Sequence, residues 1–161
     1  MDTVYIETSI VSHATAWPSS DIQIAALQYQ ARNWWSTERP NFELVTSQLV
    51  IDEASAGDPT AAAERLKLLD GLPIVSIDDD VRTLARAIVS AAIVPQNAAA
   101  DALHVAAAAV ARVQYLLTLN CRHIANAREL PRIYRLLDEH GCGQLLICTP
   151  AEFLGGDDDD E

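Results

Sequence analysis

The sequence predicts an α/β fold, a three-layer α/β/α sandwich around a central, mostly parallel sheet of five strands. Apolar runs of strand length alternate along the chain with longer segments of helical pattern, the order typical of parallel sheets with right-handed crossovers. The first run, Val4 to Ile6, is unbroken and apolar, as expected for a strand covered on both faces. At 161 residues, half of them hydrophobic, the chain is long enough for one domain with a substantial core.

The five predicted strands are short, mainly apolar segments set off by turn sequences such as SAGDP and DGLP. In chain order they are VYIET (residues 4–8), Phe42 to Ser47, Pro73 to Ile77, Tyr115 to Leu119 and Leu145 to Thr149.

Helices are predicted in the gaps between these strands. Asp78 is a candidate N-cap residue, and Pro95 is a helix breaker that precedes the next predicted helix. Pro150 suits the first position of a final helical turn. The predicted helices span Asp21 to Thr37, Gln48 to Ala56, Thr60 to Leu69, Asp79 to Ile93, Ala98 to Arg112 and about Pro131 to Glu139, followed by a turn at Pro150 to Leu154.

The composition favours a cytoplasmic protein. No apolar stretch approaches the roughly 20 residues that cross a bilayer, and the N-terminus lacks a signal segment, so we expect no membrane association. Cys121, Cys142 and Cys148 form no CxxC pair, which favours a reducing compartment over a structural zinc site. We expect one domain over residues 1–154 and a disordered acidic tail over residues 155–161.

The formal charge of −12 argues against broad electrostatic binding to nucleic acid. One short stretch near the C-terminus is nevertheless basic. A solvated helix face and a phosphate-binding surface are both compatible with this stretch. Its members are Arg122, His123, Arg128, Arg132 and Arg135.

Four oxygen-bearing side chains are predicted to meet at one edge of the sheet. Glu7 follows the apolar core of the first strand, Glu53 lies in the second turn after the second strand, Asp101 lies near the start of a helix, and Asn120 follows the strand YLLTL. In an open parallel sheet, ligands bind at the carboxyl ends of the strands, where the following helices begin. The four residues are therefore candidate site residues.

Each candidate also has an ordinary structural explanation. Glu7 and Glu53 suit boundary acids facing water, and Asp101 suits a first-turn acid favoured by the helix dipole. Asp101 stands, however, in the almost wholly apolar segment AAADALHVAAAAVA, where an unpaired carboxylate is costly. His104, three residues on, is predicted to be a hydrogen-bonded core residue and is left out of the candidate set.

A cluster of carboxylates without Cys or His ligands selects a hard cation such as Mg²⁺ or Mn²⁺. A water bound to such an ion has a lowered pKa, and the ion neutralises charge that builds up on phosphate oxygens. An acidic protein can then act on an anionic substrate.

The segments YIETS, SQLVIDEASAGDP, AADALHVAAAAV and LLTLNCRHIANA together resemble the PIN-domain family, in particular the VapC-like toxins of toxin–antitoxin pairs. The resemblance runs in order from Val4 to about Phe153. It implies a parallel sheet of strand order 3-2-1-4-5 and a Mg²⁺- or Mn²⁺-dependent ribonuclease. It also implies an RNA substrate, a small antitoxin protein as partner and, commonly for the family, a homodimer.

The resemblance assigns the catalytic and metal-ligating positions to Glu7, Glu53, Asp101 and Asn120, with Ser9 and Thr118 as supporting hydroxyls. Two positions depart from the family pattern, which has an aspartate at each of them. Glu7 adds a methylene, and Asn120 keeps a carbonyl oxygen but loses a charge. A catalytically weakened PIN-like domain that binds protein or RNA is therefore the alternative. A receiver-like phosphoacceptor domain is disfavoured, because Lys67 is the single lysine and lies mid-chain.

Overall fold

The protein contains a five-stranded sheet in the order β3-β2-β1-β4-β5. All four pairings are parallel, so the predicted fold class and strand order are confirmed. The structure is a computed structural model that describes residues 1–153. The strands are β1 (Thr3–Ile6), β2 (Glu43–Ser47), β3 (Ile74–Val75), β4 (Tyr115–Leu117) and β5 (Leu146–Cys148).

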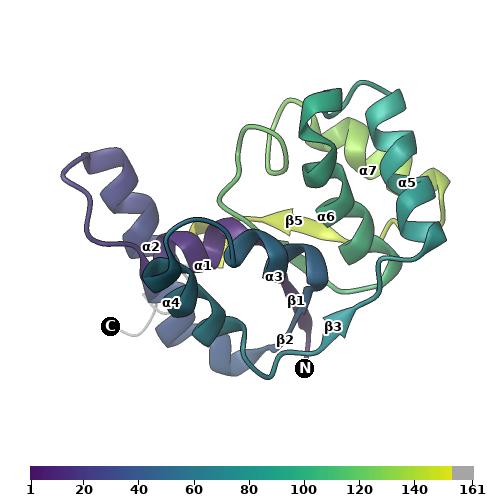
Figure 1. Cartoon of the computed structure of the whole chain (residues 1–161). Coiled ribbons are helices and arrows are strands. Elements are labelled where there is room, and N and C mark those ends of the chain that lie inside the picture. The colour runs from purple at the N-terminus through teal and green to yellow at the C-terminus, as the bar shows by residue number, and fades with distance from the viewer. Residues whose placement is uncertain (154–161) are drawn as a thin grey trace, which may run out of the picture.

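The helices form two groups. Figure 1 shows α1 to α4 gathered on one side of the sheet and α5 to α7 on the other, the arrangement of a three-layer sandwich. The α-helices are α1 (Thr8–Thr15), α2 (Ile22–Thr37), α3 (Gln48–Ala54), α4 (Pro59–Leu69), α5 (Asp79–Ser90), α6 (Ala99–Val110) and α7 (Leu130–Glu139). Short 3₁₀ helices are η1 (Arg39–Asn41), η2 (Gln96–Ala98) and η3 (Pro150–Phe153).

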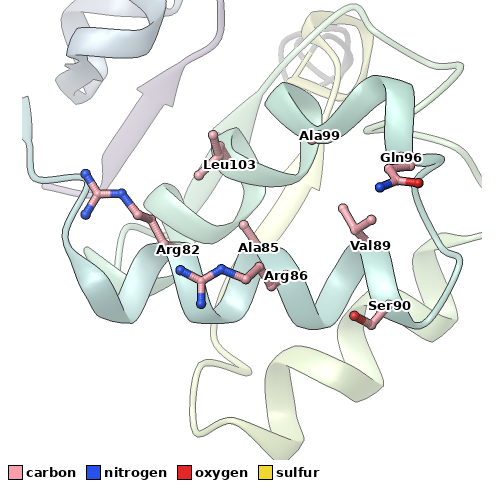
Figure 2. A pocket seen from close by; sticks show the side chains of 8 residues that line it. All are labelled: Arg82, Ala85, Arg86, Val89, Ser90, Gln96, Ala99 and Leu103. Atoms are coloured by element: carbon pink, nitrogen blue, oxygen red, sulfur yellow. The ribbon is translucent and has the colours of Figure 1, made fainter.

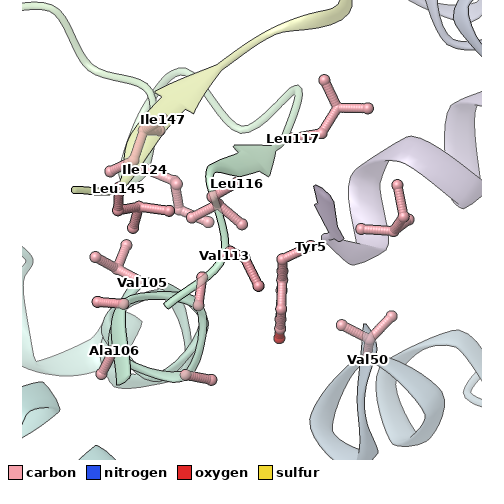
Figure 3. Packing of buried hydrophobic residues seen from close by; sticks show 14 of the residues in the cluster. Tyr5, Val50, Val105, Ala106, Val113, Leu116, Leu117, Ile124, Leu145 and Ile147 are labelled. Atoms are coloured by element: carbon pink, nitrogen blue, oxygen red, sulfur yellow. The ribbon is translucent and has the colours of Figure 1, made fainter. Parts of the chain in front are cut away.

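The central strand β1 lies at the middle of the core. Val4, Tyr5 and Ile6 are fully buried, as their unbroken apolar run predicts for a strand that is covered on both faces. In Figure 3 the Tyr5 ring stands between α6 and Val50 of α3, close to Leu116 of β4. Side chains from both helical layers therefore pack against the two central strands.

One helix was not predicted. The segment VYIET was expected to be a strand through Thr8, but β1 ends at Ile6 and α1 begins at Thr8. The chain changes from strand to helix at Glu7. The backbone of Glu7 is extended, and its carboxylate accepts the Ser9 N–H. This cap satisfies one of the free amide groups of the first helical turn.

Three predicted helices end earlier than expected. The helix predicted to reach Ala56 ends at Ala54, the one predicted to reach Ile93 ends at Ser90, and the one predicted to reach Arg112 ends at Val110. For the last two the reason is local, because Ala92 has a φ of 57° and Arg112 a φ of 58°. This left-handed conformation terminates a right-handed helix.

The acidic tail predicted over residues 155–161 lies outside the described residues, as does Leu154 of the last predicted turn. Within residues 1–153, none of the helices combines the length and the apolar character that crossing a bilayer requires. Cys142 and Cys148 are buried thiols, and Cys121 is exposed.

Candidate functional site

Glu7 lies at the carboxyl end of the central strand and is almost completely buried. Only 4% of its surface is exposed, and its Oε2 accepts the backbone N–H of Ser9. Burial raises the pKa of the Glu7 carboxyl, although the charge of His104 and the hydrogen bonds from Ser9 oppose that shift. Glu7 is thus a carboxylate that its own surroundings make costly to ionise.

Glu53 lies in α3 and points toward the same region. Its Oε1 accepts hydrogen bonds from His104 Nε2 at 2.7 Å and from Thr8 Oγ1. Burial acts to raise the pKa of Glu53, but the hydrogen bond and charge of His104, together with the bond from Thr8, outweigh it and lower that pKa. Its neighbour Asp52 is exposed and accepts from Gln48 Nε2 at 2.8 Å. Glu53 is therefore the inward-facing acid of the two.

Asp101 lies in the first turn of α6 and is partly buried. Burial raises the pKa of its carboxyl, and the charges of His104 and His123 and a hydrogen bond from the Asn120 side chain oppose that shift. The charge of Glu53 also acts on both Asp101 and Glu7. The three acids therefore share one neighbourhood at the carboxyl edge of the sheet.

Asn120 lies beside this neighbourhood but uses its carbonyl oxygen locally. Its Oδ1 accepts the backbone N–H of His123 at 3.1 Å, and its own backbone N–H donates to Thr118 Oγ1 at 3.0 Å. The side chain thus stabilises the turn after β4 and interacts with Asp101. The sequence suggested a ligating oxygen at this position, whereas that oxygen already has a backbone partner.

Ser9 and Thr118 join the two central strands where they end. Ser9 Oγ lies 3.4 Å from Thr118 Oγ1 and accepts the backbone N–H of Leu119 at 2.8 Å. These hydroxyls tie the start of α1 to the segment after β4. They therefore hold Glu7 and Asn120 in a fixed relation to one another.

His104 is the residue at this edge that sequence reasoning left out. It is 1% exposed and lies in α6. Nδ1 lies 2.9 Å from the Tyr5 hydroxyl, and Nε2 faces Glu53. The available signal was its spacing of three residues from Asp101, which places the two side chains on neighbouring parts of one helix face. The predicted core histidine is thus hydrogen-bonded, and one of its partners is a candidate site residue.

The site has the donor chemistry for a hard cation but is not closed around one. Within residues 1–153, no three His, Cys, Asp or Glu side chains are grouped closely enough to hold a metal ion. Glu53 Oε2 has no hydrogen-bond partner among the described residues, and Asp101 is partly exposed. These oxygens are of the kind that Mg²⁺ and Mn²⁺ prefer. The residues fit such an ion in kind, although within residues 1–153 they are not gathered around an ion position.

The basic stretch near the C-terminus is only partly available to a substrate. Arg132 donates to Glu129 Oε2 at 2.8 Å and to the carbonyl of Ala91 at 2.6 Å. Arg122, by contrast, is exposed, close in sequence to Asn120. His123 is the member of this stretch whose charge acts on Asp101. Arg122 and His123 are therefore the members of the stretch that a phosphate-binding role would use.

A separate groove of about 420 Å³ lies between α5 and α6. Figure 2 shows Arg82 and Arg86 of α5 along it, with Ala99 and Leu103 of α6 on the other side. Ala99 and Leu103 are four residues apart and share one face of α6, whereas Asp101 lies about 200° around the helix from Ala99. The groove is thus on the face of α6 away from the acids and contains none of them.

Comparison with known proteins adds no family assignment to this geometry. No protein-family model matches the sequence, and no curated protein matches it.

Proposed function

We propose that the protein is a metal-dependent endoribonuclease that uses Mg²⁺ or Mn²⁺ to cleave RNA phosphodiesters. The observation that carries this proposal is the gathering of Glu7, Glu53 and Asp101 at the carboxyl edge of a 3-2-1-4-5 parallel sheet. Three acids in one neighbourhood repel one another, and a divalent cation relieves that repulsion. The edge is also where ligands bind in parallel α/β sheets.

The protein's own side chains would divide the work as follows. Glu7, Glu53 and Asp101 would hold the ion, while the Asn120 side chain would act to lower the pKa of Asp101. Ser9 and Thr118 would keep the two strand ends together. When bound, the ion supplies a water of lowered pKa and neutralises charge on the phosphate. If the chemistry of the PIN-domain family applies, cleavage by such a water leaves 5′-phosphate ends.

The proposal is tested by comparing two aspartates that each lie in the first turn of a helix. Asp101→Asn should abolish Mn²⁺-dependent cleavage of a structured RNA by the purified protein. The matched control is Asp80→Asn, because Asp80 is an exposed acid in the first turn of α5. Asp80→Asn should cleave like the wild type. Cleavage that survives Asp101→Asn would contradict the assignment of this site.

The finer proposal is that the protein is the toxin of a toxin–antitoxin pair. Its support is the sequence resemblance together with exposed apolar side chains in the α1–α2 connection and the first half of α2, which an apolar partner segment would cover. Trp17 is 92% exposed, Ile22 83% and Tyr29 63%. A short reading frame directly upstream, whose product forms a complex with this protein and inhibits it, is the expected finding. Light scattering of the purified protein tests the proposed homodimer.

A second candidate function is a PIN-like domain that binds protein or RNA without efficient cleavage. Two observations favour it: Asn120 Oδ1 already accepts a backbone hydrogen bond, and the described acids are not closed around an ion site. Calorimetric titration with Mn²⁺ separates the two functions. A ribonuclease should show a saturable Mn²⁺ site that is lost in Asp101→Asn. A binding module should show no such site.

A further inference from the structure

A buried chain of hydrogen bonds begins at the N-cap of α3, crosses β1 and α6, and returns to α3. Ser47 Oγ lies 2.7 Å from the Tyr5 hydroxyl, which lies 2.9 Å from His104 Nδ1. His104 Nε2 then lies 2.7 Å from Glu53 Oε1. Figure 3 shows the Tyr5 side chain reaching between α6 and Val50 of α3. The chain thus ties three elements that are distant in sequence.

The direction of the chain follows from its fixed end. Ser47 Oγ accepts the backbone N–H of Val50 at 3.3 Å, which leaves the Ser47 hydroxyl hydrogen to be donated to Tyr5. In the singly protonated ring, Tyr5 then donates to His104 Nδ1, and the ring proton is on Nε2 and is donated to Glu53. Every donor has an acceptor in this arrangement. With the opposite direction, the Ser47 hydroxyl hydrogen would lack an acceptor within the described part of the chain.

The partner of His104 is a side chain that would otherwise be free to turn. Glu53 has three rotatable bonds, and its side chain is 34% exposed. His104 and Thr8 both donate to the same oxygen, Oε1. Two donors on one oxygen fix the plane of the carboxylate and leave Oε2 without a partner in residues 1–153. Glu53 therefore keeps Oε2 as the oxygen that a ligand could use.

We infer that His104 is a positioning residue of the site, which holds Glu53 in its orientation while Tyr5 fixes the imidazole tautomer. The expected effect on cation binding rests on the proposed function. The positioning of Glu53 by His104 does not require a cation. Partners of this kind behind metal ligands are worth about 10- to 100-fold in metal affinity. A histidine that only fills the core would have no such effect on a folded protein.

The test compares His104→Leu, which removes both ring nitrogens, with His104→Gln, whose side-chain amide can still donate toward Glu53. His104→Leu should weaken Mn²⁺ binding about 10- to 100-fold in calorimetry, and His104→Gln should recover most of that loss. Tyr5→Phe should give a smaller loss than His104→Leu. The control is His140→Gln, because His140 is an exposed residue at the end of α7, and its affinity should match the wild type.

Two metal-free NMR measurements keep the inference separate from the proposed function. In the wild type, ¹⁵N shifts should show the Nε2–H tautomer of His104, and three-bond couplings should show one χ1 rotamer for Glu53. The tautomer preference should weaken in Tyr5→Phe, and the Glu53 couplings should average in His104→Leu. If His104→Leu does not fold, Tyr5→Phe and His104→Gln still report on both quantities.

The outcomes are distinguishable. If the wild type binds no Mn²⁺ but shows the tautomer and the single rotamer, the proposed function fails and the positioning stands. If the wild type shows the Nδ1–H tautomer or an averaged Glu53, the positioning is overturned. It is also overturned if folded His104→Leu binds Mn²⁺ as tightly as the wild type.

Discussion

Within residues 1–153, four carboxylates cap helices through their side chains, and one of them is unlike the others. Asp21, Asp58 and Asp78 cap α2, α4 and α5, and each is exposed. Their carboxylate oxygens accept a backbone N–H of the first turn at 2.9 Å, 2.9 Å and 3.0 Å respectively. Glu7 caps α1 in the same way but is 4% exposed. Three of the helix caps are therefore exposed to solvent, and one is buried in the core.

This difference indicates what capping can and cannot explain. An exposed aspartate caps a helix at little cost in ionisation, and aspartate is among the preferred N-cap residues, whereas glutamate is not. Burial makes a carboxylate a poorer cap. It raises the pKa of Glu7 and so disfavours the charged form, which is the stronger hydrogen-bond acceptor. Capping accounts for the three aspartates, and the burial of Glu7 calls for a further role, which a cation would supply.

The comparison is tested most strongly by removing one charge at each kind of cap. Glu7→Gln keeps an acceptor oxygen but loses the charge, and it should lower Mn²⁺-dependent RNA cleavage by about 100-fold or more, because metal binding contributes several kcal/mol to such reactions. Asp58→Asn makes the same change at an exposed cap and should leave the rate unchanged. Equal rates for the wild type and Glu7→Gln would show that Glu7 is only a cap.

Adding a charge at the same edge should have a smaller effect. Asn120→Asp should tighten Mn²⁺ binding by about tenfold, because the charge of the ligands sets the affinity of oxygen sites. The new carboxylate can still accept the His123 N–H that Asn120 Oδ1 accepts now. Calorimetry measures the change. An unaltered dissociation constant would place residue 120 outside the ligand set and strengthen the alternative of a binding module.

In the absence of metal, Glu7→Gln should stabilise the protein. The substitution removes a buried charge while retaining the cap, and changes of this type commonly add about 0.5–2 kcal/mol to the free energy of unfolding. Asp21→Asn, at an exposed cap where asparagine serves equally well, should shift that free energy by less than about 0.5 kcal/mol. Chemical denaturation in a chelating buffer measures both. A destabilised Glu7→Gln would mean that the Glu7 charge is already satisfied within the protein.

The stabilisation by Glu7→Gln should depend on pH in a defined direction. The folded pKa of Glu7 is raised above its unfolded value, so its stabilising contribution is present below the unfolded pKa and is lost as pH rises through the folded pKa. The two proteins should therefore be equally stable in acid, and the variant should gain its advantage as pH increases toward neutrality. If the variant were more stable than the wild type only in acid, the pH dependence would have the opposite sign. That result would contradict the description of Glu7 as a buried, uncompensated carboxylate.

The fold could be predicted from the sequence largely because its apolar patterns are local. The β1 run from Val4 to Ile6 and the alternation of strands and helices identify a parallel sheet, and the predicted helix ends agree with α2 and α7 to within one residue. What failed was α1, because the residues after Ile6 continue to favour a strand, while the helix start depends on the Glu7 cap. The early ends of α5 and α6 depend on the φ angles of Ala92 and Arg112, which a composition rich in alanine does not reveal.

The candidate site could be predicted in part. Strand ends and helix starts meet at one edge in any parallel sheet, so the placement of Glu7, Glu53 and Asp101 followed from topology. The role of His104 did not, because its partners Tyr5 and Glu53 lie 99 and 51 residues away in sequence. The local partner of Asn120 Oδ1 was also missed, since it depends on the turn that the chain makes after β4.

Titration of the wild type and of Glu7→Gln with Mn²⁺, followed by calorimetry at neutral pH, tests the central claim most directly. The acids at the sheet edge should give a saturable site in the wild type, and Glu7→Gln should weaken or remove it while the protein remains folded. The absence of a saturable site in the wild type, or identical isotherms for the two proteins, would contradict the claim that Glu7 is buried to hold a cation.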